Sequence, residues 1–205
     1  MKQTIDINTT NFTAVNTAIK NEIMEGENTL VVSKADKLMM FDENTYARLN
    51  DVIFNNGTIE VRMLSRLLPD APDFARGFIG IAFGINEDDS RFDSFYVRPT
   101  NSVTVINDPV RNSHGCQYFS YPGYTFQYFR DHSITTYENQ VSCELDKWMD
   151  LKAEINKDGG RFYLDGQLVL TVDKFISESH RGYLGLFVDI GTEAFFKDLK
   201  ITPID

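Results

Sequence analysis

Hydrophobic residues recur at every second position in the last quarter of the chain. They form four runs: Met149/Leu151/Ala153/Ile155, Phe162/Leu164, Leu168/Leu170/Val172 and Leu184/Leu186/Val188. Turn-forming sequences separate these runs, at Lys157–Gly160, Asp165–Gly166 and Ile190–Glu193. Alternation with Asp-Gly between the runs is the strongest short-range signal for a β-hairpin. The pattern predicts an antiparallel meander with one buried face, and that face needs a second sheet to cover it.

Similar alternation predicts four strands earlier in the chain, at residues 29–33, 57–65, 77–85 and 94–99. The strand 77–85 is unusual because Gly80, Ala82 and Gly84 leave one of its faces almost bare. A neighbouring loop or a ligand can therefore approach this backbone closely. In the strand 94–99, Tyr96 and Arg98 are expected to project from the face opposite the core.

Two segments are harder to interpret. Residues 116–129 are rich in aromatics and contain Pro122-Gly123, which predicts a further hairpin in which Phe119, Phe126 and Phe129 face inward. Near the N-terminus the apolar positions fit either a short helix capped by Thr13 or an irregular edge; these positions are Ala14, Ile19, Ile23 and Met24. Residues 44–50 form either a strand or a connection.

The composition is that of one globular β domain. The 205 residues are 42% hydrophobic and 24% charged, and they include 16 Phe and 9 Tyr, which favour β structure. We expect a single domain over residues 1–205, all-β, built as a sandwich of two antiparallel sheets. Cys116 and Cys143 are not spaced as a zinc-binding pair, and free thiols are favoured over a disulfide, although their pairing is left open.

The net charge of −10 bears on partners and location. Nucleic acids and anionic membranes bind through Lys and Arg, and the chain has no long basic run, so neither partner is expected. The sequence begins without an apolar leader and contains no stretch approaching the roughly 20 apolar residues of a membrane span. We therefore expect a cytoplasmic protein. The acidic turn at residues 86–93 lacks an EF-hand pattern, so no metal site or cofactor is expected, although calcium bound by loop oxygens stays possible.

The closing segments resemble a known fold family. The order Trp-x-x-Leu, turn, Arg-Phe-Tyr-Leu-Asp-Gly, strand, Gly-x-Leu-Gly-Leu and Phe-x-Asp-Leu-x-Ile resembles the last hairpins of concanavalin A-like (laminin-G-like) jelly rolls, found in lectins, carbohydrate-binding modules and glucanases. Over residues 57–201 the chain is also similar to bacterial glycoside hydrolase-like domains of unknown function. The resemblance implies a jelly-roll sandwich that binds or processes an oligosaccharide or polysaccharide. The similar domains often have an Arg at the position that Gly84 occupies in this chain.

Sugars are bound by aromatic rings that cover their apolar faces and by planar polar groups that bond their hydroxyls. The sequence places both kinds of residue near one another. The predicted aromatic platform is Tyr118, Tyr121 and Tyr124, and the predicted hydrogen-bonding groups are Tyr96, Arg98, Asn101, His114 and Gln117. Arg additionally suits a uronate carboxylate, because its fork binds a carboxylate through two hydrogen bonds.

A catalytic site is less well defined. Glycoside hydrolysis normally needs two flanking carboxylates, and no spacing pairs the candidates Glu60 and Asp189 convincingly; His114 is a further candidate as a base. We therefore expect a lectin-like protein that binds an oligosaccharide in a concave groove. A glycoside hydrolase of the same fold and a protein-interaction module without sugar activity are the alternatives.

Overall fold

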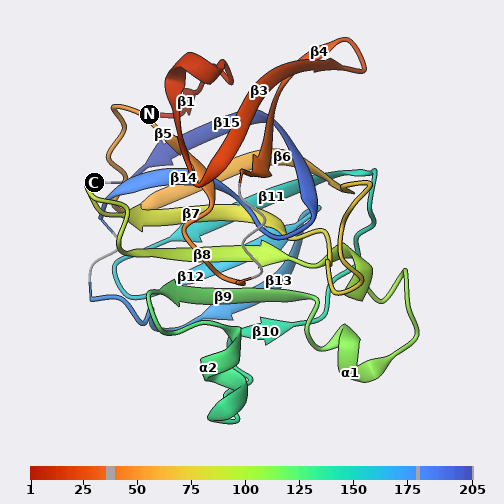
Figure 1. The fold of residues 1–205 in the computed structure, drawn as a ribbon. Coiled ribbons are helices and arrows are strands. Elements are labelled where there is room, and N and C mark those ends of the chain that lie inside the picture. The colour runs from red at the N-terminus through yellow and green to blue at the C-terminus, as the bar shows by residue number, and fades with distance from the viewer. Residues whose placement is uncertain (36–39, 179–180, 205) are drawn as a thin grey trace.

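The computed structural model describes residues 1–35, 40–178 and 181–204. Within these ranges the strands form two antiparallel sheets that pack face to face (Figure 1). The seven-stranded sheet contains β2 (Phe12–Val15), β5 (Tyr46–Leu49), β7 (Ile79–Ile85), β8 (Phe92–Val97), β9 (Cys116–Tyr121), β10 (Glu138–Asn139) and β14 (Tyr183–Val188). The eight-stranded sheet contains β1 (Gln3–Thr4), β3 (Thr17–Met24), β4 (Glu27–Lys34), β6 (Gly57–Leu67), β11 (Trp148–Ile155), β12 (Gly160–Leu164), β13 (Gln167–Val172) and β15 (Thr192–Pro203). The prediction of an all-β sandwich is confirmed.

Strand order follows a jelly-roll pattern rather than the order of the sequence. The seven-stranded sheet runs β10-β9-β8-β7-β14-β5-β2, and the eight-stranded sheet runs β13-β12-β11-β6-β15-β4-β3 with β1 paired to β15. Two short helices, α1 (Pro109–Asn112) and α2 (Phe126–Asp131), lie below the sheets in Figure 1. Among the described residues, no helix has the length and apolar character needed to cross a bilayer.

The core between the sheets is built by the alternation seen in the sequence. In β6, Ile59, Val61 and Met63 are at most 2% exposed and face the other sheet. Phe95 of β8 stacks on Phe162 of β12 across the core, with ring centroids 4.4 Å apart. Burying large apolar side chains in this way supplies the main driving force for packing the two sheets.

The C-terminal quarter only partly forms the predicted meander. Strands β11, β12 and β13 are consecutive neighbours in one sheet, with turns at the predicted positions. Strand β14, however, pairs with β5 and β7 in the other sheet, and β15 returns to lie between β4 and β6. The turn at Ile190–Glu193 therefore connects the sheets. Alternation shows that a face is buried, but it does not show which sheet a strand joins.

Two earlier predictions are also corrected. Of the two alternatives for the N-terminal segment, the helix capped by Thr13 is wrong: the segment forms β2 and β3, which are edge strands of the two sheets. After β9 the chain turns at Pro122-Gly123 and forms α2, so a hairpin through residue 129 is also wrong. Phe119 and Phe129 are buried, but in a cluster on the outer face of the seven-stranded sheet and not in the core between the sheets, so their predicted inward orientation is wrong. Phe126 is only half-buried. A spacing of three places residues 126 and 129 on one face of a helix, whereas in a strand they would point to opposite faces.

The outer face of the seven-stranded sheet carries a second apolar cluster. Phe92, Tyr96, Phe119 and Phe187 lie side by side there, and Phe129 of α2 packs over them. Tyr96 stacks on Phe187 with ring centroids 5.5 Å apart. The predicted orientation of Tyr96, opposite to the core residues of β8, is thus present. This outer cluster holds α2 on the sheet, and two of its residues, Phe78 and Tyr96, line a cavity there.

Candidate functional site

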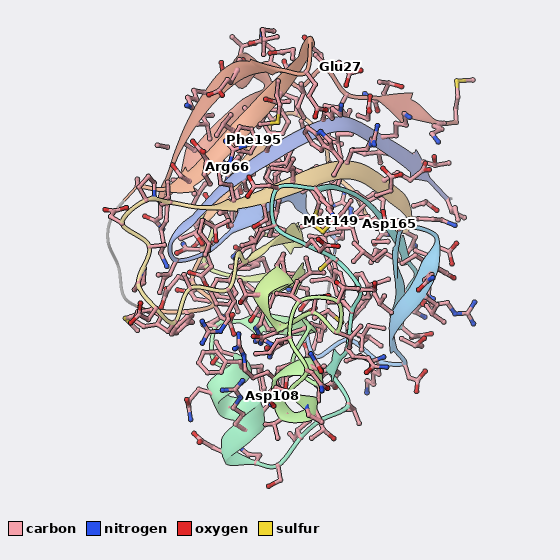
Figure 2. The ribbon with its side chains drawn as sticks, turned by 90° about the vertical axis from the view of Figure 1, so that its right-hand side faces the viewer. Glu27, Arg66, Asp108, Met149, Asp165 and Phe195 are labelled. Atoms are coloured by element: carbon pink, nitrogen blue, oxygen red, sulfur yellow. The ribbon has the colours of Figure 1, made fainter. Side chains whose placement is uncertain are left out.

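A cavity of about 490 Å³ opens on the outer side of the seven-stranded sheet, where β8 ends and β9 begins. Its walls come from distant parts of the chain. The loop before β5, the loop before β7, the segment after β8, and helices α1 and α2 each contribute side chains. In Figure 2, Asp108 marks the start of α1, which lies beside α2 at this end of the molecule. The volume is typical of a small-molecule site.

One wall of the cavity is aromatic. Phe41 is at its centre and makes edge-to-face contacts with Phe74, Phe78 and Phe126, with ring centroids 5.5, 5.7 and 5.3 Å away. Phe78 is buried, whereas Phe74 and Phe126 remain partly open to solvent. Tyr96 adds its ring from the sheet. Such a wall offers flat apolar surface to a ligand.

A hydrogen-bonded network around Arg98 forms the polar floor. Nη1 of Arg98 donates to Glu138 Oε1 at 2.9 Å and to the His114 carbonyl at 3.0 Å. Nη2 donates to the Tyr96 hydroxyl at 2.7 Å and to the side-chain oxygen of Gln117. The side chains of Arg98 and Glu138 are each only 5% exposed. The guanidinium is therefore held rigidly by a buried ion pair with good geometry.

His114 is oriented by the same carboxylate. Its Nδ1 lies 2.8 Å from Glu138 Oε2. Because an ionised carboxylate only accepts hydrogen bonds, Nδ1 carries the proton in this contact. Asn101 Nδ2 donates to the His114 carbonyl at 3.3 Å, which fixes the segment after β8 to the segment before β9.

Three further arginines line the cavity. Arg111 donates from Nε and Nη2 to Asn101 Oδ1 at 3.2 and 3.1 Å. Arg76 donates to the Asp73 and Ala75 carbonyls at 2.7 and 2.9 Å. Arg130 lies over the Phe126 ring, 4.9 Å from its centroid. All of these partners are neutral, so the three guanidinium charges are not compensated by them.

Four of the predicted ligand-binding residues lie together in the cavity lining: Tyr96, Arg98, Asn101 and His114. Gln117 does not line it; its side chain is buried and accepts hydrogen bonds from Arg98 and Tyr96, so it positions them. The ligand-binding role of these residues stays a prediction, but the structure brings them to one place.

The predicted tyrosine platform does not form. Tyr118 faces the core between the sheets, is 0% exposed, and donates its hydroxyl to Asp93 Oδ1 at 2.9 Å. Tyr121 stacks on Phe92 and Tyr124 packs against Tyr128, both outside the cavity lining. The strand parity of β9 explains this result, because residues 118 and 121 point to opposite faces of the sheet.

The candidate carboxylates are also separated from the cavity. Glu60 lies in β6 of the eight-stranded sheet, where it pairs with Lys2 at 2.6 Å. Asp189 is buried and accepts from Lys34 Nζ at 2.8 Å and from the Asp42 amide at 2.8 Å. Of the side chains in the described part of the chain, those that line the cavity include no carboxylate. Glu60 and Asp189 are therefore not placed as a catalytic pair.

Asp42 is a buried carboxylate that sequence reasoning missed. Its Oδ2 accepts from the Phe126 amide at 2.8 Å, so it connects the loop bearing Phe41 to the start of α2. Burial, together with the nearby charge of Asp189, raises the pKa of Asp42 to about 6. Burial also raises the pKa of Asp189, although Lys34 acts in the opposite direction. The two acids and Lys34 hold the aromatic wall in place.

Most of the cavity wall could not be predicted from local sequence patterns. The missed lining residues are Phe41, Phe74, Arg76, Phe78, Val110, Arg111, Phe126 and Arg130. They lie in loops and short helices, where no periodicity marks a functional position. The clearest available signal was the group of arginines around 76, 98 and 111 in an acidic chain. In the described ranges, no cluster of three or more His, Cys, Asp or Glu is arranged to hold a metal ion.

No family model and no curated protein matches the sequence. Solved structures match its fold. The carbohydrate-binding module CBM66 from Bacillus subtilis matches with a TM-score of 0.60 and 14% identity, over 94% of this chain and 96% of that one. The Crh5 transglycosylase matches with a TM-score of 0.55 and 13% identity, over 100% and 84%.

A β-1,3-1,4-glucanase (lichenase) derived from a mouse hindgut metagenome also matches. Its TM-score is 0.52 and its identity 14%, over 90% of this chain and 83% of that one. Identities this low establish a shared fold and leave function to the site itself. The resemblance predicted from the closing strands is confirmed at that level: the chain has the concanavalin A-like jelly-roll fold.

Proposed function

We propose that the protein is lectin-like and binds an oligosaccharide in the cavity on the outer side of the seven-stranded sheet. The observation that carries this proposal is the composition of the cavity lining. Phe41, Phe74 and Phe126 offer flat apolar surface, while Arg98, Asn101 and His114 offer planar polar groups beside it. Sugars present the same combination, an apolar ring face bordered by hydroxyls. Solved structures of the same fold that are named for carbohydrate binding or glucanase activity support the proposal.

Binding without turnover is favoured over hydrolysis. A glycosidase of the usual kind places two carboxylates on either side of the bond to be cleaved. The lining contributed by the described residues has none, and Glu138 is engaged by both Arg98 and His114. These features support a role in holding a ligand, because no pair of groups among the described residues of the lining is placed to supply an acid and a nucleophile.

The proposal is tested by isothermal titration calorimetry with a panel of plant, bacterial and host oligosaccharides. Phe126→Ala removes part of the aromatic wall, and Tyr124→Ala removes an exposed ring outside the lining as the matched control. We expect Phe126→Ala to weaken binding about tenfold or more and Tyr124→Ala to leave it unchanged. Thermal unfolding of both variants checks that they fold. Absence of binding across the panel, or equal loss in both variants, would overturn the proposal.

A further inference from the structure

The cavity collects positive charge in an acidic protein. The chain has 30 Asp and Glu against 20 Lys and Arg, for a net charge of −10. The cavity lining nevertheless contains Arg76, Arg98, Arg111 and Arg130. Neutral sugars are held well by amides, hydroxyls and carboxylates, so a neutral ligand does not account for four guanidinium groups around one cavity.

These four arginines differ in how their charge is compensated. Arg98 forms an ion pair with Glu138, and that pair is neutral overall. In the described part of the chain, Arg76, Arg111 and Arg130 make no ion pair with a carboxylate; their partners are carbonyl groups, an amide oxygen and an aromatic ring. The cavity therefore holds up to three uncompensated positive charges.

The positive charges are close enough to act on one another. Partial burial is the larger cause that lowers the pKa of Arg76, and repulsion from Arg111 and Arg98 lowers it further. Asn101 accepts from both Nε and Nη2 of Arg111 and so fixes the plane of its guanidinium at the cavity. Holding like charges together costs free energy in the empty protein, and an anion placed between them recovers it.

The geometry points to an anionic sugar as the ligand: we propose that Arg76, Arg111 and Arg130 bind the carboxylate of a uronic acid, or the sulfate of a sulfated sugar, while the aromatic wall contacts the ring. This inference rests on the proposed function and specifies its ligand class. Guanidinium groups bind such oxyanions through paired, charge-assisted hydrogen bonds. The aromatic wall beside them separates this site from one for a free inorganic anion, which has no apolar face.

Calorimetric titrations with matched sugars test the inference. The probes are oligogalacturonides, alginate oligosaccharides, carboxyl-reduced oligogalacturonides as their neutral counterparts, and a sulfated oligosaccharide with its desulfated form. Each is titrated into the wild-type chain and into Arg76→Gln, Arg111→Gln and Arg130→Gln. Arg161→Gln is the matched control, because Arg161 is exposed in β12 of the other sheet. Arg130 is also exposed, so its substitution keeps the test valid if another variant fails to fold.

We expect at least one anionic sugar to bind about tenfold or more tightly than its neutral counterpart. Each cavity variant should lose about tenfold for the anionic sugar and less than about twofold for the neutral one. The control Arg161→Gln should match the wild type. If only the uronic acid sugars bind more tightly than their neutral counterparts, the anion is a carboxylate. If only the sulfated sugar does so, the anion is a sulfate.

Two results would overturn the inference in different ways. Equal affinity for anionic and neutral sugars, unchanged by the three variants, would remove the inference and leave the proposed sugar binding intact. Absence of binding by every sugar, charged and neutral, would remove both.

Discussion

At the scale of single residues, Glu138 is the anchor of the site. It accepts from Arg98 and faces His114 Nδ1, and its side chain is 5% exposed. Gln117 completes the set by accepting from Arg98 and Tyr96. A guanidinium in this position depends on its carboxylate, because an unpaired buried charge is far more costly than an unpaired exposed one.

Replacing Glu138 should therefore destabilise the protein. We expect Glu138→Ala to lower the free energy of unfolding by about 3 kcal/mol, because Arg98 loses its buried counterion. The matched control is Glu60→Ala, since Glu60 pairs with Lys2 where the side chains are 37% and 50% exposed; it should cost less than about 1 kcal/mol. Urea denaturation of both variants gives the comparison. Similar losses in the two would show that Glu138 does not hold Arg98 as described.

Asp42 should give the stability a distinctive pH dependence. Its pKa in the folded protein is raised from 3.8 to about 6, so the folded state binds its proton more tightly than the unfolded state. The stability that this proton provides is present below pH 4 and is lost as the pH rises through 6. The full effect is about 3 kcal/mol, since one pKa unit corresponds to about 1.4 kcal/mol.

The variant Asp42→Asn isolates this effect, because an amide oxygen still accepts from the Phe126 amide. Relative to the wild type, we expect Asp42→Asn to gain stability steadily between pH 4 and pH 7. Denaturation curves at a series of pH values measure the difference. Stability profiles that stay parallel over this range would contradict a raised pKa at Asp42.

At the scale of elements, strand β7 shows how tightly the site sheet is packed. The bare face predicted at Gly80 is covered by the protein itself: a Cβ at Gly80 would collide with the Phe95 carbonyl oxygen and the Tyr96 backbone of β8. The predicted alternatives were a neighbouring loop and a ligand, but the close approach at Gly80 is made by the paired strand β8. The cavity lies elsewhere on this sheet, where β8 ends and β9 begins.

Gly80→Ala should thus be more harmful than an equivalent change in the next strand. At Gly185 of β14 a Cβ would meet side chains, Ile85 and Tyr46, at 3.0 Å, and side chains can shift where backbone cannot. We expect Gly80→Ala to cost at least about 2 kcal/mol and Gly185→Ala clearly less. Thermal melts of the two purified variants provide the test. A larger loss for Gly185→Ala would mean that β7 and β8 are less closely packed than described.

The same scale shows what could be predicted from the sequence. Alternation located β6 and the turns of β11–β13, because one-sided burial leaves a period of two. Strands β7 and β8 were also located, although both of their faces are buried. Alternation could not assign β14 to the seven-stranded sheet, because the sequence of a strand that is buried on both faces does not indicate which strands it pairs with. It also missed α2, where aromatics at 126 and 129 serve a helix that covers the outer cluster.

The residues of the candidate site likewise divide into those that the sequence pattern predicted and those that it missed. Tyr96 and Arg98 were predicted from the alternation of one strand, and Asn101 and His114 were predicted from their polar side chains in the segment that follows it. The wall residues Phe41 and Phe74, by contrast, come from loops, and only the folded chain brings them together. Tyr118 was misplaced because an aromatic-rich segment does not reveal which rings face the core.

At the scale of the whole molecule, charge and fold act separately. The sandwich provides a sheet on which loops and short helices build a cavity. Figure 1 shows where α1 and α2 lie relative to the sheets. The net charge of −10 repels an anion at long range, but at physiological salt this repulsion is screened beyond about 8 Å. The arginines of the cavity therefore act on a ligand at contact, where they add affinity and selectivity rather than speed of association.

The central claim is that the outer-face cavity is the sugar site, and amide chemical-shift mapping by NMR tests it most directly. Isotope-labelled protein is titrated with the neutral and anionic oligosaccharides described above. We expect shifts confined to Phe41 and to residues 74–78, 96–101, 110–114 and 126–130, which surround the cavity. Shifts confined to the eight-stranded sheet, or no shifts with any of the sugars, would contradict it.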